Sequence, residues 1–221
     1  EPRWCQSAGR SDPADPDSEP RLQPMHAITW AHPERIVGTS GWSQVFALDG
    51  TTGKLLWEGQ AHPPISCSPD GEEFAMHPAG IAYYDTRTGL PNGKLPLHVG
   101  AESLIYSRDG ARLAAIVQPD NKWGAEPGIF IYERGVYHYS PDLPPLSDGQ
   151  YQLAWRPVGR KAAITAAGRL QIWALGEAPV KELDIPAPGG GHVAYGDGVL
   201  ISRGNFGLGF VRERDGAVIG A

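Results

Sequence analysis

Cysteine is scarce in this sequence. The 221 residues include only two, Cys5 and Cys67, which can form at most one disulfide. Two cysteines are too few to indicate an oxidising compartment, so the localisation stays open. In the repeat described below, Cys67 takes a position that aromatic residues hold in the other copies. We therefore expect a thiol that packs in the core and does not act as a nucleophile.

The sequence also lacks the long runs that define several classes of protein. No run of about 18 apolar residues occurs, so no membrane-inserted helix is expected. The 19 Lys and Arg residues form no basic block and are outnumbered by 25 Asp and Glu, which argues against nucleic acid and anionic membranes as partners. No amphipathic stripe of about 12 or more residues indicates a helix. Because 29 glycines and 21 prolines interrupt the chain as well, the sequence predicts an all-β protein.

Motifs for catalysis and metal binding are not found either. The sequence has no Gly-x-Ser-x-Gly elbow, no phosphate-binding loop and no zinc-protease helix motif. Three histidines, His62, His77 and His98, fall on one predicted face, but they lack the close spacing of metal ligands. We therefore predict no catalytic residue, no metal site and no cofactor, and we favour a protein that is not an enzyme.

The first 24 residues differ from the rest of the chain. They are polar, acidic and rich in proline, with Trp4, Cys5 and Leu22 as the obvious apolar anchors. Such a segment buries too little apolar area to fold alone, so we expect an N-terminal arm or linker over residues 1–24. The alternative is an arm that wraps around the domain, with Trp4 in a surface groove.

From residue 25 to the end, a unit of four short strands (A, B, C and D) recurs five times. The residues just before each A–B turn mark the period, with spacings of 37, 39, 49 and 40: Trp30, Cys67, Tyr106, Trp155 and Tyr195. A period of about 40 residues with four strands is typical of β-propeller blades. The blades are expected at approximately 25–59, 60–98, 99–141, 142–186 and 187–221. The D strands are expected at 54–57, 94–97, 136–139, 180–183 and 217–219.

All five units run in the same phase, and the last D strand falls at the end of the sequence. No blade therefore combines strands from both chain ends as a clasp. We predict a five-bladed β-propeller of four-stranded antiparallel blades, closed by packing between blades with or without help from the arm. The alternative is a larger ring, completed elsewhere in a longer protein or by a second copy. The oligomeric state stays open.

Two kinds of repeat carry a family resemblance. Residues 65–75 (ISCSPDGEEFA) and 106–114 (YSRDGARLA) resemble WD-type propeller repeats, particularly the bacterial kind without a strict Trp-Asp ending. Residues 46–57 (FALDGTTGKLLW) resemble a quinoprotein-type repeat. Both resemblances imply a ring-shaped platform. The Gly-His pair and the Trp-Asp ending are missing, so the His–Asp network of WD repeats does not carry over, and the acidic metal site of quinoprotein enzymes is not recognisable.

The predicted binding surface is the face formed by the B–C and D–A loops, because function concentrates on loops. A polar excursion over residues 118–128 contains a tryptophan and is expected to account for the long third spacing. Trp42, Trp123 and Phe206 would form an aromatic recognition surface, since tryptophan is enriched at interface hot spots. Asp120, Asn121 and Lys122 would add polar contacts to a peptide or sugar. The alternative is that the excursion packs on the neighbouring blade.

The sequence thus predicts a non-enzymatic platform that binds a protein or peptide through this face. The alternative function is a propeller that binds or hydrolyses glycans with carboxylates near the ring centre, for which Asp120, Glu126 and Glu102 are the candidates. Two carboxylates about 5 to 10 Å apart would favour hydrolysis, and a shallow aromatic surface would favour binding.

Overall fold

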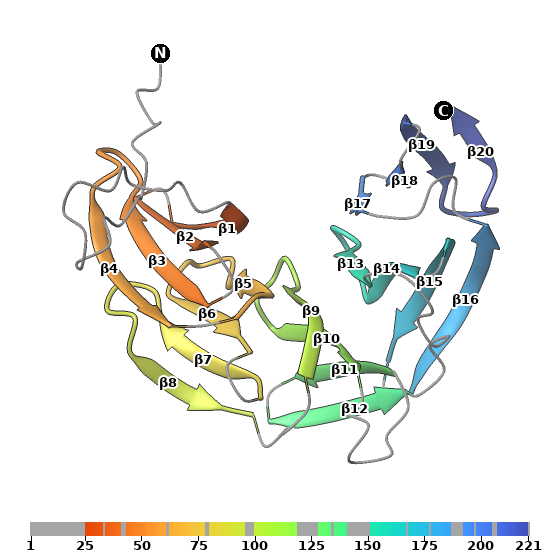
Figure 1. Ribbon diagram of the computed structural model, residues 1–221. Coiled ribbons are helices and arrows are strands. Elements are labelled where there is room, and N and C mark those ends of the chain that lie inside the picture. The colour runs from red at the N-terminus through yellow and green to blue at the C-terminus, as the bar shows by residue number, and fades with distance from the viewer. Residues whose placement is uncertain are drawn as a thin grey trace. The chain divides into compact units, whose positions relative to one another are not determined.

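The computed structural model describes most of the chain from residue 25 onward. The described residues are 25–32, 34–40, 43–60, 62–77, 80–95, 100–118, 128–133, 135–140, 151–166, 168–176, 178–186, 192–196, 198–204 and 207–220. They form twenty β-strands in five four-stranded antiparallel sheets, which we name sheets I to V in chain order (Figure 1). Within these ranges, no helix has the length and apolar character needed to cross a bilayer.

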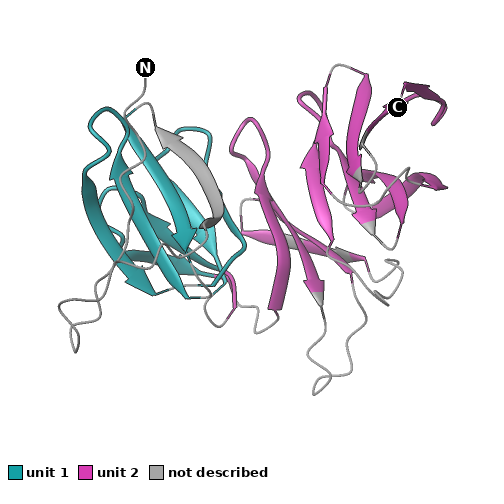
Figure 2. Ribbon diagram, turned by 45° about the horizontal axis from the view of Figure 1, so that its top comes forward, with its two compact units in different colours: residues 1–78, 82–94 teal, residues 79–81, 95–221 magenta. Residues whose placement is uncertain are grey.

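The chain divides into two compact units (Figure 2). Unit 1 comprises residues 1–78 and 82–94, and unit 2 comprises residues 79–81 and 95–221. In every sheet the hydrogen-bonded neighbours are consecutive in sequence, so each sheet is a meander. The predicted organisation into four-strand units that share one phase is therefore confirmed.

Unit 1 contains sheets I and II. Sheet I consists of β1 (Met25–His32), β2 (Arg35–Ser40), β3 (Gln44–Asp49) and β4 (Leu55–Gln60). Sheet II consists of β5 (Ile65–Cys67), β6 (Glu73–Met76), β7 (Ala82–Asp85) and β8 (Pro91–Lys94). Their core joins buried side chains from β2, β3, β5 and β6, namely Val37, Val45, Ala47, Ile65, Phe74 and Met76. Cys67 is half-buried and packs against this core.

Unit 2 contains sheets III, IV and V. Sheet III consists of β9 (Gly100–Tyr106), β10 (Arg112–Gln118), β11 (Gly128–Glu133) and β12 (Val136–Ser140). Sheet IV consists of β13 (Gln152–Trp155), β14 (Lys161–Ala166), β15 (Arg169–Leu175) and β16 (Pro179–Pro186). Sheet V consists of β17 (Val193–Tyr195), β18 (Val199–Gly204), β19 (Gly207–Arg212) and β20 (Val218–Gly220).

Two cores hold unit 2 together, one on each side of sheet IV. Toward sheet III, Ile116 and Ile131 meet Tyr151, Trp155 and Trp173. The core toward sheet V is built from Ala163, Leu170, Ile172, Leu200 and Val211. Because sheet IV is covered on both faces, its middle strand β15 is almost continuously buried and shows no simple alternation of polar and apolar residues. The D strands lie at sheet edges, and β4 and β8 are mostly exposed.

The A–B turns of sheets II and III match each other. In sheet II the hydroxyl of Ser68 donates to Asp70 at 2.6 Å and accepts from the backbone N–H of Glu73 at 3.1 Å. In sheet III the hydroxyl of Ser107 donates to Asp109 at 2.6 Å and accepts from the backbone N–H of Arg112 at 3.0 Å. The serine and the aspartate thus close each turn with local bonds, as their sequence pattern predicts.

The C–D turns of sheets I and II also match each other. Asp49 accepts hydrogen bonds from the backbone N–H and the hydroxyl of Thr52, at 2.6 and 2.8 Å. Asp85 accepts the same pair of bonds from Thr88, at 2.7 and 2.9 Å. Each turn then ends on a glycine with positive φ, because the backbone has to reverse there into the D strand.

Two expectations are corrected by these strands. The second D strand was expected at 94–97, but the structure places it at Pro91–Lys94, as β8. The turn before it already ends at Gly89, just as the equivalent turn in sheet I ends at its own glycine. The excursion after β10 accounts for only part of the long third spacing. Nine residues separate β10 from β11, but eleven separate β12 from β13, and both connections are longer than their counterparts in the other sheets.

Candidate functional site

The six residues predicted to bind a partner lie outside the described residues, so the loop surface stays a prediction. They are Trp42, Asp120, Asn121, Lys122, Trp123 and Phe206. Of the carboxylates considered for glycan hydrolysis, Glu102 is exposed on β9, whereas Asp120 and Glu126 are outside the described ranges. Of the three histidines, His62 is exposed, His77 is half-buried and His98 is not described. Within the described ranges, no group of three or more His, Cys, Asp or Glu side chains could hold a metal ion.

The described residues contain a cavity of about 470 Å³ in unit 2, which we call the charged cleft. It lies where the A–B turn and D strand of sheet IV meet the C–D turn of sheet V. Its lining is mostly charged: Arg156, Lys161, Ile172, Glu182, Leu183, Gly198, Arg212, Glu213 and Arg214. The cleft is therefore built from A–B and C–D turns, and not from the B–C and D–A loops that the sequence favoured.

A second cavity of about 300 Å³ lies between the A–B turns of sheets III and IV, and we call it the turn cleft. Residues 107–109 line it from sheet III, and residues 156–159 line it from sheet IV. Arg156 is the residue shared by the turn cleft and the charged cleft.

Glu213 organises the charged cleft. Its side chain is only 10% exposed, and its Oε2 lies 3.1 Å from Nε of Arg156. Its Oε1 lies 4.0 Å from Nζ of Lys161, which also pairs with Glu182 at 2.5 Å. The backbone N–H of Glu213 donates to the carbonyl oxygen of Gly198 at 3.0 Å, which fixes the residue directly after β19. Removing Arg156 would leave this largely buried carboxylate with only the 4.0 Å contact to Lys161, which is costly in a buried site.

Tyr195 lies beside this network at the end of β17. Burial raises the pKa of its hydroxyl far above the usual value, and the neighbouring Glu213 carboxylate raises it further. The phenol therefore stays protonated at any physiological pH. It contributes a neutral polar group below the charged side chains.

The carboxylates in the turns of sheets II and III are held in their ionised form. The hydroxyl of Ser68 lowers the pKa of Asp70, and the hydroxyl of Ser107 lowers the pKa of Asp109. In both cases hydrogen bonds stabilise the charged form more than burial opposes it. These aspartates are acceptors that close turns, and a general acid would need a raised pKa instead.

Sequence reasoning missed Arg156, although the repeat contains a signal for it. The backbone N–H of Ser68, Ser107 and Arg156 makes the same bond, to the carbonyl of the first B-strand residue. Arg156 thus stands where the copies in sheets II and III carry the serine that closes the turn. The serine is not present in every copy, because Gly196 makes the same bond in sheet V. Nothing in the sequence pointed to Glu213, because its partner Arg156 lies 57 residues earlier in the chain and their pairing forms only in the folded protein.

Comparison with known proteins shows the fold. No protein-family profile matches the chain, and no curated protein sequence matches it. Among solved structures, the chain is similar to hydrazine synthase from Kuenenia stuttgartiensis, a protein that contains a β-propeller, with a TM-score of 0.66 at 15% sequence identity. The match covers 81% of this chain and 68% of that chain. At this identity the likeness concerns the fold alone, and with the five antiparallel sheets it shows a propeller-like all-β protein.

Proposed function

We propose that the chain is a five-bladed β-propeller with WD-like repeats of the bacterial type, and that it acts as a non-enzymatic platform for a protein or peptide. Sheets I to V would be its blades. The fold supports this proposal because its repeated turns are closed by their own hydrogen bonds. Such turns form a rigid frame, on which the remaining side chains and loops are free to contact a partner.

The observation that carries the proposal is the charged cleft. Small-molecule sites are concave and mostly lined by apolar and aromatic side chains. Of the nine residues around this cleft, six are charged and only Ile172 and Leu183 are large apolar residues. Polar rims and arginine side chains are typical of protein–protein interfaces. A polypeptide therefore suits this cleft better than a cofactor or a small apolar ligand.

The proposal retains the B–C and D–A loops as a contact surface, with Trp42, Trp123 and Phe206 as aromatic anchors and Asp120, Asn121 and Lys122 as polar contacts. Aromatic anchors of this kind provide most of the binding energy at many interfaces. A partner bound there would lose affinity when the two tryptophans are truncated.

The test is binding of the purified, fluorescently labelled protein to an array of immobilised peptides with diverse sequences. We expect saturable, sequence-dependent binding that weakens in the double variant Trp42→Ala/Trp123→Ala. The matched control is Leu55→Ala, which truncates an exposed apolar residue on β4. An array without any saturable signal would contradict the platform function. Binding that the double variant leaves unchanged would remove the tryptophans from the proposal.

A further inference from the structure

We infer that Arg156 is the anchor of a recognition site for carboxylate groups, and that the charged cleft takes an acidic peptide segment. This inference rests on the proposed platform function and specifies its partner. Arg156 is half-buried, with 36% of its side chain exposed, and its Nε forms an ion pair with the buried Glu213 at 3.1 Å. Among the described residues, neither of its Nη atoms makes a hydrogen bond. The guanidinium is thus held at one side by Glu213 and is partly exposed to solvent.

Other arginines of unit 2 show what a purely structural role looks like. Arg112 uses one Nη on Asp109 at 3.6 Å and the other on Glu133 at 3.1 Å. Arg169 bonds through Nε to the carboxylate of Asp184 and through Nη2 to the Asp184 backbone carbonyl. Arg156 is held through Nε by one ion pair with Glu213, and its Nη groups make no hydrogen bond to any of the described residues. Two parallel N–H donors match the geometry of a carboxylate.

The charge around Arg156 also favours an anion. Together, the charged cleft and the turn cleft are lined by five cationic residues and three carboxylates, and a fourth carboxylate, Asp215, pairs with Arg212 and Arg214. The whole chain has the opposite balance, with 19 Lys and Arg against 25 Asp and Glu. A local excess of positive charge on an acidic protein attracts and orients an acidic partner.

The spacing of the positive charges suits a row of single carboxylates. The cationic residues of the charged cleft come from several separate positions, namely Arg156, Lys161, Arg212 and Arg214. A row of glutamate or aspartate side chains places single charges apart from one another. Arg156 can then pair with one of them while Arg214, which is largely exposed and lies 3.5 Å from Asp215, contacts the next.

The experiment measures fluorescence anisotropy of fluorescein-labelled hexaglutamate, with labelled hexaglutamine as the uncharged probe. We expect hexaglutamate to bind with an affinity that falls as salt is raised, and hexaglutamine to bind at least about tenfold more weakly, a factor that corresponds to about 1.4 kcal/mol. Arg156→Met should weaken hexaglutamate binding by about tenfold or more and should reduce its salt dependence. Arg156→Lys retains the charge but loses the fork, so we expect an intermediate affinity.

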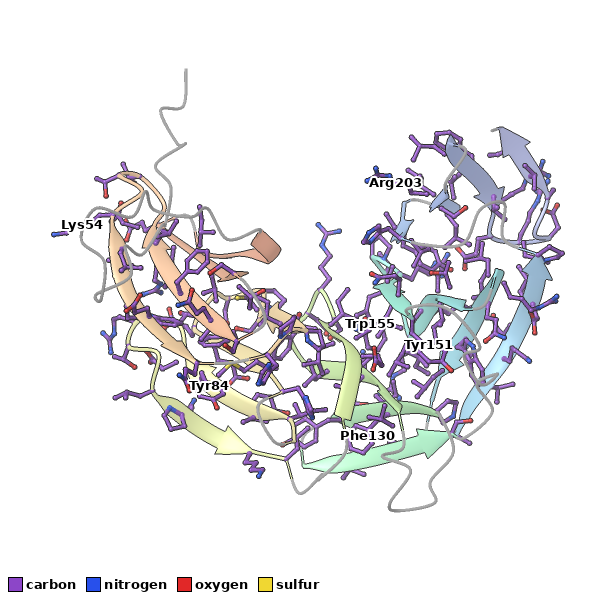
Figure 3. All side chains as sticks on the ribbon, viewed as in Figure 1. Lys54, Tyr84, Phe130, Tyr151, Trp155 and Arg203 are labelled. Carbon is purple, nitrogen blue, oxygen red and sulfur yellow. The ribbon has the colours of Figure 1, made fainter. Side chains whose placement is uncertain are left out.

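Lys54→Met is the matched control, because it removes one positive charge from an exposed turn of unit 1 (Figure 3). We expect it to change hexaglutamate binding by less than about twofold, since Lys54 lines neither the charged cleft nor the turn cleft and the charge of an exposed side chain is screened by salt. Equal effects of Arg156→Met and Lys54→Met would overturn the inference. If Arg156→Met does not fold by circular dichroism, Arg156→Lys decides, and wild-type affinity in that variant would overturn the inference too. A protein that binds array peptides but not hexaglutamate would refute the acidic partner and leave the platform function standing.

Discussion

The packing of Trp155 provides a quantitative test of the repeat. This residue ends β13, is 8% exposed, and belongs to the core between sheets III and IV together with Tyr151 (Figure 3). Its indole N–H also donates to the backbone carbonyl of Ile105 in β9 at 3.0 Å. The side chain therefore joins two sheets by apolar contact and by one hydrogen bond.

The cost of truncating Trp155 follows from these two contributions. An aromatic side chain buries about 150–250 Å², which at about 25 cal/mol per Å² corresponds to about 4–6 kcal/mol as an upper estimate. We expect Trp155→Ala to lower the free energy of unfolding by about 3–5 kcal/mol. Trp155→Phe keeps most of the apolar area but leaves the Ile105 carbonyl without its donor, so we expect a loss of about 1–2 kcal/mol.

The assay is urea unfolding followed by far-ultraviolet circular dichroism, with stability extrapolated linearly to water. In thermal unfolding, each kcal/mol should lower Tm by roughly 2–4 °C for a chain of this length. Val158→Ala is the control, because Val158 lies in the turn that directly follows Trp155 but is largely exposed. A loss of less than about 1 kcal/mol for Trp155→Ala would refute the assignment of Trp155 to the core between sheets III and IV.

Three further predictions concern single positions with matched controls. Leu208 holds in sheet V the position of Leu170 in sheet IV, but it is 49% exposed where Leu170 is fully buried. Leu170→Ala should therefore cost about 2–5 kcal/mol and Leu208→Ala less than about 1 in urea unfolding, and equal costs would contradict the exposure of Leu208. Gly89 and Gly53 share a positive φ near +70°, but a Cβ on Gly89 would lie 2.8 Å from the Trp57 ring and one on Gly53 would meet nothing within 4 Å. Gly53→Ala should therefore lower the free energy of unfolding by about 1–2 kcal/mol and Gly89→Ala by clearly more. Equal melting temperatures of the two variants would contradict the contact with Trp57. The pKa of Asp109 is lowered chiefly by the hydrogen bond from the Ser107 hydroxyl. The ionised carboxylate therefore contributes stability above the unfolded pKa near 4, and this contribution is lost as pH falls through the folded pKa. Asp109→Asn should flatten the fall of Tm between about pH 4 and pH 2, and parallel Tm curves for the variant and the wild type would contradict this contribution of Asp109.

Much of the fold could be read from local sequence patterns. Apolar strands and turn residues alternate at short range, and a repeat shows the same pattern five times. Errors arose where a choice depended on details of the turn. The D strand of sheet II was placed three residues late because Pro91, Asn92 and Gly93 look like a turn, although the turn had already closed on Asp85. A local bond between the Asp85 side chain and the Thr88 backbone decided the boundary.

The candidate site was less accessible to sequence reasoning. The aromatic loop residues that the sequence favoured lie outside the described residues, and their role stays a prediction. The charged cleft depends on a pair between Arg156 and Glu213, which are 57 residues apart and belong to different sheets. Each residue alone looks like an ordinary charge in a turn. Only the pairing distinguishes a fixed arginine from one that moves freely in solvent.

By itself, the sequence determined the strands, the turns and their order, because hydrogen bonds between residues two to five positions apart specify them. The tertiary structure decided which side chains meet between sheets. Trp57 illustrates this, since its ring stacks on Phe74 at 5.6 Å and its indole N–H donates to the carbonyl of Thr86, 29 residues further on. Such contacts depend on how two twisted sheets pack face to face, and the local pattern of either sheet is compatible with many partners.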